Sequence, residues 1–198
     1  MFTGIVTDVG RIARVDDLDV GRRLTIETAY DTAGIDIGAS IACNGACLTV
    51  VEKDASSFAA DVSGETDDKT TSGAWRVGTR INLERALRAA DELGGHLVLG
   101  HVDGVGQVTG LATEGDNHRL AIEVPAALKH YIASKGSVTV DGVSLTVNEV
   151  DNAVFGVNII PHTWENTSLS DLAVGSGVNI EVDVIARYVA RLLERDGS

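Results

Sequence analysis

A thiol, a hydroxyl and an imidazole are the side chains of this sequence that best suit nucleophilic or acid–base chemistry. Cys47 lies in Cys-Leu-Thr, and Ser144 takes its place in a second, similar segment that reads Ser-Leu-Thr. A thiol can act as a nucleophile or donate a hydrogen bond, although a lone cysteine in a strand is more often a small buried hydrophobe. His101 lies in Gly-His-Val-Asp-Gly. An imidazole can remove and return protons near neutrality, but a histidine after a glycine can equally be structural.

The other cysteine and the nearest histidine predict no metal site. Cys43 lies four residues before Cys47, and in one continuous strand the two would share a face. This pair is too sparse for a disulfide framework or a zinc site, and Cys43 fits a small buried hydrophobe. His96 and His101 have no third ligand nearby in the sequence. We therefore expect no metal, and two free thiols favour a reducing, cytoplasmic setting.

The elements that must position these residues emerge when the sequence is compared with itself. Residues 40–84 align without a gap with residues 137–181, with about 14 identities in about 45 positions. Upstream, residues 4–12 match residues 100–108 at a spacing one residue shorter. The chain is therefore a tandem duplication, for which we expect a first domain at residues 1–97, a second at 98–183 and a C-terminal element at 184–198.

Each repeat has the pattern of a small all-β domain. Leu24 and Ile26 alternate with polar neighbours, as half-buried strands do, and so do Leu120 and Ile122 in the second copy. Turn-forming residues separate short apolar segments that favour hairpins. Five or six short strands per copy, punctuated by glycine, predict two closed barrels, because closure removes exposed strand edges.

Two segments depart from this pattern. Residues 125–132 begin with a proline at a helix-start position and predict a short helix between strands. Residues 184–195 place Ile185, Tyr188 and Leu192 on one face of an amphipathic helix that has no counterpart in the first repeat. Periodicity alone leaves two functions open for this helix, which could cap its own barrel or join subunits.

Composition narrows the class of partner. The 198 residues carry a formal net charge of -13, and 44% of them are hydrophobic. Such an acidic chain offers little to attract phosphate backbones, so we expect no nucleic acid partner. No signal-like segment follows the initial methionine and no long uncharged apolar segment occurs, so we expect no export signal and no membrane span.

The duplication also indicates where a ligand would be handled, since equivalent segments in both copies hold glycine, hydroxyl groups or strand ends. Such groups can hydrogen-bond a polar heterocycle and a polyol chain, although they could also merely close a barrel. The equivalent segments are Gly4-Ile5-Val6 with Gly100-His101-Val102, Cys47-Leu48-Thr49 with Ser144-Leu145-Thr146, and Asp61 to Thr66 with Asn158 to Thr163.

Five motifs together resemble the riboflavin synthases, the lumazine-binding-repeat family. They are MFTGIV at the start, NGACLTV at 44–50, GGHLVLGHVDG at 94–104, DGVSLTV at 141–147 and NIIPHTWENTSL at 158–169. The resemblance covers essentially the whole chain. It implies two similar six-stranded Greek-key barrels, a C-terminal α-helix used for trimerisation, and one pterin-like ligand in each barrel.

The chemistry that the resemblance implies is a dismutation of two 6,7-dimethyl-8-ribityllumazine molecules. One molecule donates a four-carbon unit to the other, which yields riboflavin and 5-amino-6-(D-ribitylamino)uracil without a metal or redox cofactor. Two similar pockets held face to face suit a reaction between two copies of one compound. In the family the reacting pair meets between the first barrel of one subunit and the second barrel of a neighbour, and association with lumazine synthase is a further expectation.

The resemblance also implies roles for individual residues. Ser40, Cys47 or a water they position would add to C7 of the donor, and His101 would assist proton removal from the methyl group of the acceptor. Phe2 would stack on the ring, and Asp183 would lie near the site, although it could instead cap the terminal helix. The implied ligand contacts are Phe2, Thr3, Gly4, Ile5, Val6, Leu48, Thr49, Asp61, Val62, Ser63, Gly64, Glu65, Thr66, Gly100, Val102, Lys135, Ser144, Leu145, Thr146, Asn158, Ile159, Ile160, Pro161, His162 and Thr163.

Three functions compete at this point: the synthase, a non-catalytic lumazine- or flavin-binding paralogue, and an acidic two-barrel interaction protein. The paired ligand segments argue against the third. The binding paralogues tend to lose the histidine of the Gly-His motif and the Cys-Leu-Thr segment of the first repeat, and this sequence retains both. We therefore expect the synthase.

Overall fold

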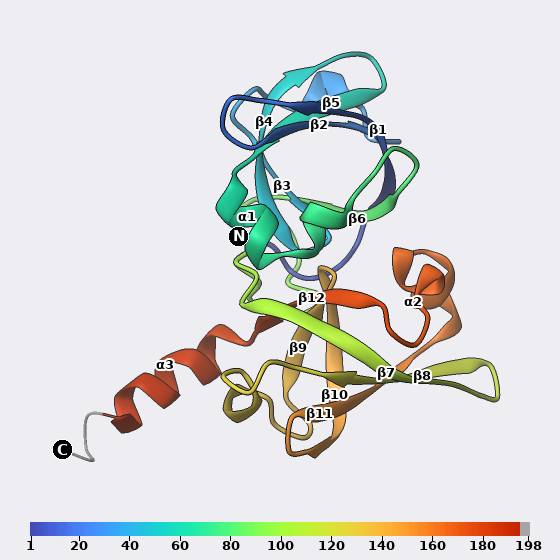
Figure 1. Ribbon diagram of the computed structural model, residues 1–198, viewed down its shortest axis with the longest axis vertical. Helices are drawn as coiled ribbons and strands as arrows, with labels where there is room; N and C mark the ends of the chain where they lie inside the picture. The colour runs from blue at the N-terminus through green and yellow to red at the C-terminus, as the bar shows by residue number, and fades with distance from the viewer. Residues whose placement is uncertain (195–198) are drawn as a thin grey trace.

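The chain forms two closed six-stranded antiparallel barrels, which confirms the predicted fold class. The computed structural model describes residues 1–194, and Figure 1 shows one barrel above the other. The first barrel has the strand order β1-β2-β5-β4-β3-β6 and the second has β10-β11-β8-β7-β12-β9. The strands of the first barrel are β1 (Asp8–Asp17), β2 (Arg22–Glu27), β3 (Ser40–Cys43), β4 (Ala46–Lys53), β5 (Ser57–Val62) and β6 (Arg80–Arg85). Those of the second are β7 (Gly104–Glu114), β8 (Asn117–Glu123), β9 (Ser137–Val140), β10 (Val143–Asp151), β11 (Val154–Ile159) and β12 (Gly177–Val182).

Each barrel encloses its own apolar core. Strands β2 and β8 bury Leu24 with Ile26 and Leu120 with Ile122, as the alternation of their sequences predicts. Most of the other core side chains are valine, isoleucine and leucine, and each core contains one fully enclosed phenylalanine from its own repeat. A chain with few aromatic residues can fill two such barrels because each is narrow enough for branched aliphatic side chains to meet across it.

The helical segments are short, apart from the last. They are η1 (Thr32–Gly34), α1 (Gly64–Lys69), η2 (Thr71–Ala74), η3 (Lys129–Tyr131), α2 (Pro161–Glu165), η4 (Ser168–Asp171) and α3 (Val184–Leu193). The short helix predicted over residues 125–132 forms only as the 3-10 helix η3 near the end of that segment, and turns occupy the residues before it. Turn hydrogen bonds from Leu128 N to Pro125 O and from Tyr131 N to Leu128 O place Leu128 and Ile132 against the barrel core without an α-helical turn.

A tight turn at Asn44–Gly45 separates the two cysteines. Both turn residues have positive φ, +42° and +81°, which is the conformation that Asn-Gly favours in two-residue hairpins. Cys43 therefore ends β3 and points into the core, whereas Cys47 lies on β4 and is half-buried outside it. The expectation that both cysteines share one strand face is wrong, and the Asn-Gly pair was the sequence signal for the turn.

The two barrels meet around a local two-fold relationship between their equivalent hairpin turns. A Cβ added to Gly45 would lie 2.9 Å from the backbone nitrogen of Gly142, so the two turns touch through glycine backbone. Asn82 Nδ2 donates to the carbonyl oxygen of Asp141 at 2.8 Å, and Asn179 Nδ2 donates to that of Asn44 at the same distance. These reciprocal bonds cross between barrels and fix how the repeats face each other.

The segments that precede the two barrels cross over. Residues 1–6 begin the first repeat but lie against the second barrel, where Ser144 N donates to Gly4 O at 2.8 Å. Residues 98–102 begin the second repeat but lie against the first barrel, where Cys47 N donates to Gly100 O at 2.9 Å. Phe2 and Val98 pair with each other between them. Figure 1 accordingly shows the N-terminus between the barrels.

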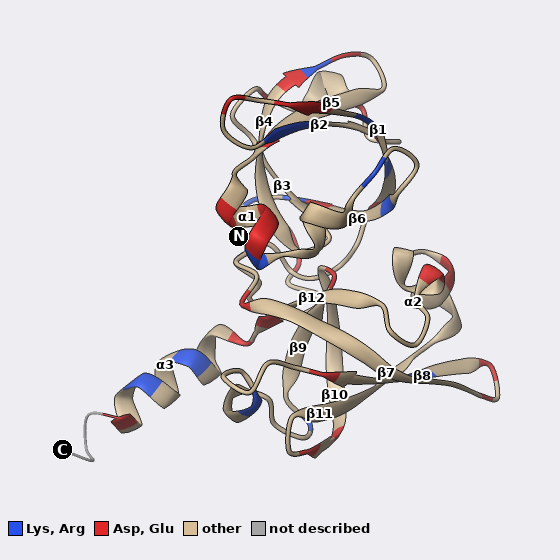
Figure 2. Ribbon diagram, viewed as in Figure 1, with Lys and Arg blue, Asp and Glu red and all other residues tan. Residues whose placement is uncertain are grey.

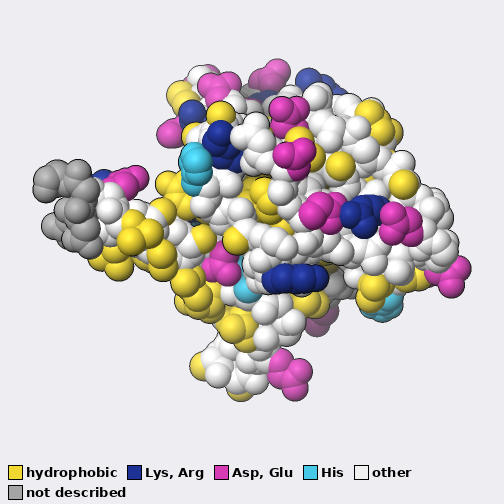
Figure 3. All heavy atoms as spheres, turned by 90° about the horizontal axis from the view of Figure 1, so that it is seen from below, with side chains coloured by type: hydrophobic (Ala, Val, Ile, Leu, Met, Phe, Trp, Pro, Cys, Tyr) yellow, Lys and Arg dark blue, Asp and Glu magenta, His cyan; other side chains and the backbone are white. Residues whose placement is uncertain are grey.

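Helix α3 projects away from both barrels (Figure 1). Asp183 caps its start by accepting a hydrogen bond from Ile185 N at 2.9 Å, and Arg187 binds Asp103 at 2.6 Å. Tyr188 and Leu192 are 64% and 63% exposed, and Figure 3 shows apolar side chains gathered along this projection. The predicted end of the helix at Arg195 lies outside the described residues.

Acidic and basic side chains are interspersed over both barrels (Figure 2). Several form ion pairs across neighbouring strands, such as Arg23 with Asp61 at 2.6 Å. Within residues 1–194, no helix is long and apolar enough to cross a membrane.

Candidate functional site

A cavity of about 280 Å³ on the first barrel gathers several of the predicted site residues. The barrel itself supplies Cys47, Glu65 and Thr66, and the crossing segment of the second repeat supplies Gly100, His101 and Val102. The thiol of Cys47 and the imidazole of His101 therefore line one space although they are 54 positions apart in sequence. Lys69 and Thr70 complete the wall, and sequence reasoning missed both. Their position one helical turn after Glu65 and Thr66 was the available signal.

Glu181 holds the segment that carries His101. Its carboxylate accepts hydrogen bonds from the backbone nitrogens of Leu99, Gly100 and His101 at 2.7, 2.9 and 2.9 Å. Burial raises the pKa of Glu181 to about 7, against the opposing effect of these three donors. One side chain of β12 thus satisfies three successive backbone donors and fixes the entry of His101 into the first site.

Gly100 and Phe2 determine how closely this segment approaches Cys47. Gly100 has a φ of +77°, and a Cβ there would lie 2.6 Å from the Cβ of Cys47 and 2.9 Å from the ring of Phe2. Phe2 is fully buried beside Ala42, Val98 and Cys47. The ring of Phe2 therefore packs against Cys47, and its stacking on a ligand ring stays a prediction.

The second barrel repeats the arrangement with different side chains. Ser144 takes the place of Cys47, and Gly4, with a φ of +77°, approaches it as Gly100 approaches Cys47. Glu84 takes the place of Glu181 and accepts from Thr3 N, Thr3 Oγ1 and Gly4 N at 2.7, 2.8 and 2.9 Å. Burial raises the pKa of Glu84, opposed by these donors. Ile5 stands where the first site has His101, so the two sites are not chemically equivalent.

His96 is a site residue that sequence reasoning missed. Its Nδ1 lies 2.7 Å from Ser144 Oγ and its Nε2 lies 3.2 Å from Thr139 Oγ1. Burial lowers the pKa of His96, and the nearby charge of Asp183 opposes this shift. Asp183 therefore caps α3 and lies near enough for its charge to act on His96. Comparison of the two repeats could not reveal this pairing, because His96 lies in the linker, outside the segments that align.

The remaining predicted residues do not all converge. Ser40 lines a separate cavity of about 190 Å³ with Arg85 and Arg88, away from the set that contains Cys47 and His101. Asp61 is held by Arg23, with Nε to Oδ1 and Nη2 to Oδ2 distances of 2.6 and 3.0 Å. Its counterpart Asn158 has a buried Oδ1 without a hydrogen-bond partner among residues 1–194. An amide oxygen left unsatisfied in this way suits a ligand donor.

The other predicted contacts follow the strands and turns of their repeats. Leu48, Val62 and Ile159 are buried in the barrel cores, whereas Glu65, Ile160 and His162 are exposed. Lys135 occupies a turn with a φ of +67°. The remaining predicted contacts are exposed or half-buried. Thr49 lies on β4, Leu145 and Thr146 lie on β10, Ser63 and Gly64 lie at the start of α1, and Pro161 and Thr163 lie on α2.

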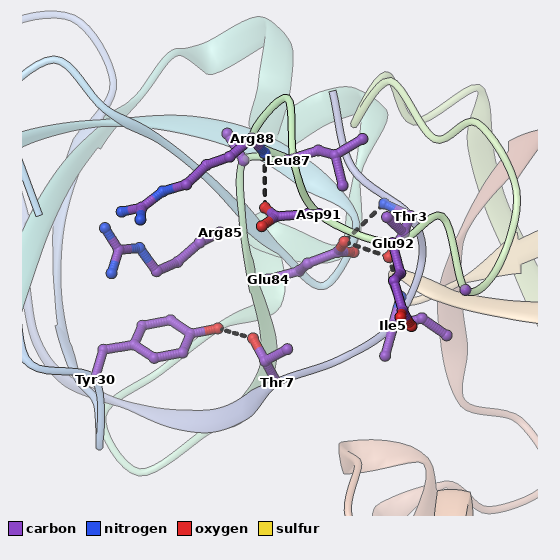
Figure 4. A pocket seen from close by; sticks show the side chains of 12 residues that line it. Thr3, Ile5, Thr7, Tyr30, Glu84, Arg85, Leu87, Arg88, Asp91 and Glu92 are labelled. Carbon is purple, nitrogen blue, oxygen red and sulfur yellow. Dashed lines mark hydrogen bonds between the residues drawn. The ribbon is translucent and has the colours of Figure 1, made fainter.

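A further cavity, beside the N-terminal segment, shares Thr3, Ile5 and Glu84 with the second site. It measures about 540 Å³ and is lined by the odd-numbered side chains Thr3, Ile5 and Thr7 (Figure 4). Val6, on the other face of this extended segment, packs against the core of the second barrel. In Figure 4 the hydroxyl of Tyr30 points at Thr7, with 2.5 Å between their oxygens. One face of the N-terminal segment therefore packs against the second barrel, and the other face lines this cavity.

Within residues 1–194, no three histidine, cysteine, aspartate or glutamate side chains gather as a metal site would require. A ligand at these sites would be bound through the side-chain and backbone hydrogen-bonding groups described above.

Comparison with known proteins places the chain in a family. The model of the lumazine binding domain matches twice, over residues 3–86 and 99–183. Riboflavin synthase of Brucella abortus is 48% identical over 199 residues, which cover 98% of each chain. Riboflavin synthase of Photobacterium phosphoreum is 46% identical over 98% of this chain and 89% of its own, and that of Mycobacterium tuberculosis is 44% identical over the full length of both.

Solved structures agree with the sequence comparison. The structure of LumP complexed with 6,7-dimethyl-8-(1'-D-ribityl) lumazine superimposes with a TM-score of 0.83 at 28% identity, over 92% of this chain and 99% of that one. LumP complexed with riboflavin gives a TM-score of 0.86 at the same identity and coverage.

Proposed function

The chain belongs to the lumazine-binding family of riboflavin synthases, and from this premise we propose how its two barrels divide the work of that transferase reaction. Two 6,7-dimethyl-8-ribityllumazine molecules react, and a four-carbon unit passes from one to the other. The products are riboflavin and 5-amino-6-(D-ribitylamino)uracil, so every atom of both substrates is retained. The substrate ring accepts the electrons, and the reaction requires no added oxidant or reductant.

The observation that supports this function most strongly is the crossed arrangement of two related sites. Each barrel presents a Cys-Leu-Thr or Ser-Leu-Thr strand, and the segment that closes it comes from the other repeat. Such a pair can hold two copies of one compound in fixed orientation, which converts an encounter of two molecules into a step within one complex. The likeness of the repeats serves binding, and their differences allow one molecule to donate while the other accepts.

In the first site, His101 removes a proton from the methyl group on C7 of one lumazine. Glu181 accepts hydrogen bonds from the backbone nitrogens of Gly100 and His101, so positioning this imidazole costs little ordering when the ligand binds. Cys47, or a water that it positions, adds to C7 of the other lumazine. Ser40, which lines a different cavity, is the weaker candidate for this role.

In the second site, His96 orients the hydroxyl of Ser144. The imidazole is hydrogen-bonded through both ring nitrogens, so Ser144 Oγ is engaged in either tautomer. Because burial favours the neutral ring, His96 can accept the Ser144 proton or return one near neutrality. Asn158, whose buried Oδ1 has no hydrogen-bond partner in the described part of the chain, supplies an acceptor for a ring N–H of the ligand.

We further propose that the protein acts as a homotrimer joined through α3. The helix exposes Ile185, Tyr188, Val189 and Leu192 along a projection that its own barrels do not cover. Association would bury this stripe and bring the first barrel of one subunit to the second barrel of another. A cytoplasmic location and association with lumazine synthase remain predictions, the former supported by two free thiols.

The direct test is incubation of the purified protein with 6,7-dimethyl-8-ribityllumazine while riboflavin absorbance and fluorescence are followed. We expect turnover in the wild type and strong losses of kcat in His101→Ala and Cys47→Ser. Wild-type rates in both variants would remove these residues from the chemistry. Tight binding without turnover would instead favour a lumazine-binding protein similar to LumP.

A further inference from the structure

Helices α1 and α2, which carry Glu65 and His162 at equivalent positions of the two repeats, are anchored in different ways. In the first barrel, Arg22 on β2 binds Asp67 on α1. In the second barrel, the equivalent positions are His118 on β8 and Trp164 on α2, and their rings stack with centroids 3.9 Å apart and an interplanar angle of 13°. The duplication thus gave the same place in the fold an ion pair in one copy and an aromatic stack in the other.

The anchor of the first barrel is a closed hydrogen-bonded network. Arg22 Nε and Nη2 donate to the two carboxylate oxygens of Asp67 at 2.7 and 2.8 Å, and Nη2 also donates to Ser72 O at 2.7 Å. Ser72 Oγ donates to Asp67 Oδ1 at 2.6 Å. The two charged side chains are only 14% and 17% exposed, so solvent screens this pair weakly. Burial tends to raise the pKa of Asp67, but the donors of Arg22 and Ser72 bring it below its ordinary value.

The anchor of the second barrel lacks these directional bonds. Leu169 replaces Ser72 at the equivalent position, and it is fully buried in the barrel core. Helix α1 is also capped, because Ser63 Oγ accepts from Thr66 N at 3.1 Å, whereas Ile160 at the start of α2 offers no side-chain acceptor. Two stacked rings can slide over each other with little change in contact, whereas a bidentate ion pair fixes both distance and angle.

We propose that Asp67 and Trp164 are positioning residues that make the first site rigid and the second site adaptable. Asp67 does not line the first site, but it directly follows Glu65 and Thr66, which do. Its hydrogen-bonded network therefore fixes the helix that carries these two residues. Trp164 follows His162 and Thr163, so the stack lets that part of the second site adjust to its ligand. The inference rests on the proposed function only for the identity of the ligand, since the difference in rigidity belongs to the free protein.

Hydrogen–deuterium exchange of the full chain, with and without riboflavin, tests this proposal. The matched amides are Asp67 N, bonded to Ser63 O at 3.0 Å, and Trp164 N, bonded to Ile160 O at the same distance. In the free protein we expect the Trp164 amide to exchange at least about tenfold faster than that of Asp67. Riboflavin should slow exchange in residues 160–167 and leave residues 63–70 unchanged.

Variants separate the anchor from its surroundings. Asp67→Asn should raise exchange of α1 to the level of α2, and should raise the KM for the lumazine more than it lowers kcat. Asp68→Asn, the same change on an exposed neighbour that forms no ion pair among residues 1–194, should do neither. Equal exchange of the two helices in the free wild type would overturn the proposal, and this comparison needs no variant to fold. Absence of riboflavin binding alongside unequal exchange would contradict the proposed function and leave the inference standing.

Discussion

Replacing Asp141 by asparagine should stabilise the protein, and the gain should grow with pH. Asp141 is 4% exposed, and its Oδ1 accepts one hydrogen bond, from Asn179 N at 2.8 Å. At the equivalent position of the first repeat, Asn44 Oδ1 accepts from Asn82 N at 2.6 Å. An amide therefore already performs the same role in the same turn, and asparagine tolerates the φ of +45° found at Asp141.

The magnitude follows from the titration of the buried carboxyl. Burial raises the pKa of Asp141 from 3.8 to about 7, so the folded protein keeps a proton that the unfolded chain releases. The contribution of this group to stability therefore falls as pH rises from its ordinary pKa through about 7. At about 1.4 kcal/mol for each unit, the loss between about pH 5 and pH 7 is about 2 kcal/mol, since the group is half-titrated at the upper end. Asparagine does not titrate and escapes this loss.

Urea unfolding at both pH values measures the effect. The difference between Asp141→Asn and the wild type should be about 2 kcal/mol larger at about pH 7 than at about pH 5, and taking this difference cancels other titrating groups such as Glu181. Asn44→Asp, which places a carboxyl in the equivalent turn, should show the opposite trend. A difference that does not change with pH, or a variant less stable than wild type at the higher pH, would refute the argument from burial.

Three further outcomes follow from the contacts between and around the barrels. Gly45→Ala should lower the free energy of unfolding in urea by about 2 kcal/mol or more, because its Cβ would meet Gly142 N at 2.9 Å. As a control, Gly38 has a similar φ of +88° but open space around its Cβ position, so Gly38→Ala should cost only about 1 kcal/mol of backbone strain. Phe2→Ala should cost about 3 to 5 kcal/mol in the same assay and raise the KM for the lumazine, since the ring supports Cys47; an unchanged KM would separate Phe2 from the site. Tyr188→Glu should dissociate the proposed trimer in analytical ultracentrifugation and reduce activity, whereas Arg191→Gln on the polar face should not; a monomer with full activity would contradict a site shared between subunits.

The sequence predicts the barrels well because their determinants are repeated and local. Alternation at Leu24 and Ile26 recurs at Leu120 and Ile122, so each copy supports the assignment of the other. The prediction is weaker where one short segment had to be judged alone. The turn at Asn44–Gly45 was assigned to a continuous strand, although Asn-Gly is a strong hairpin signal. Residues 125–132 have helical spacing of apolar residues, yet barrel contacts satisfy that spacing with two turns.

The site is harder to predict than the barrels because its essential contacts join the two repeats. Comparing a repeat with its copy identifies Cys47 with Ser144, but no such comparison reveals that Gly100 covers Cys47 or that Gly4 covers Ser144. The same crossing explains why His96 was overlooked. His96 lies in the linker between the repeats, outside the segments that align, so comparison of the two copies does not identify it. Duplication therefore provides two matching pockets, and the linker between the copies adds the imidazole of His96 to the second one.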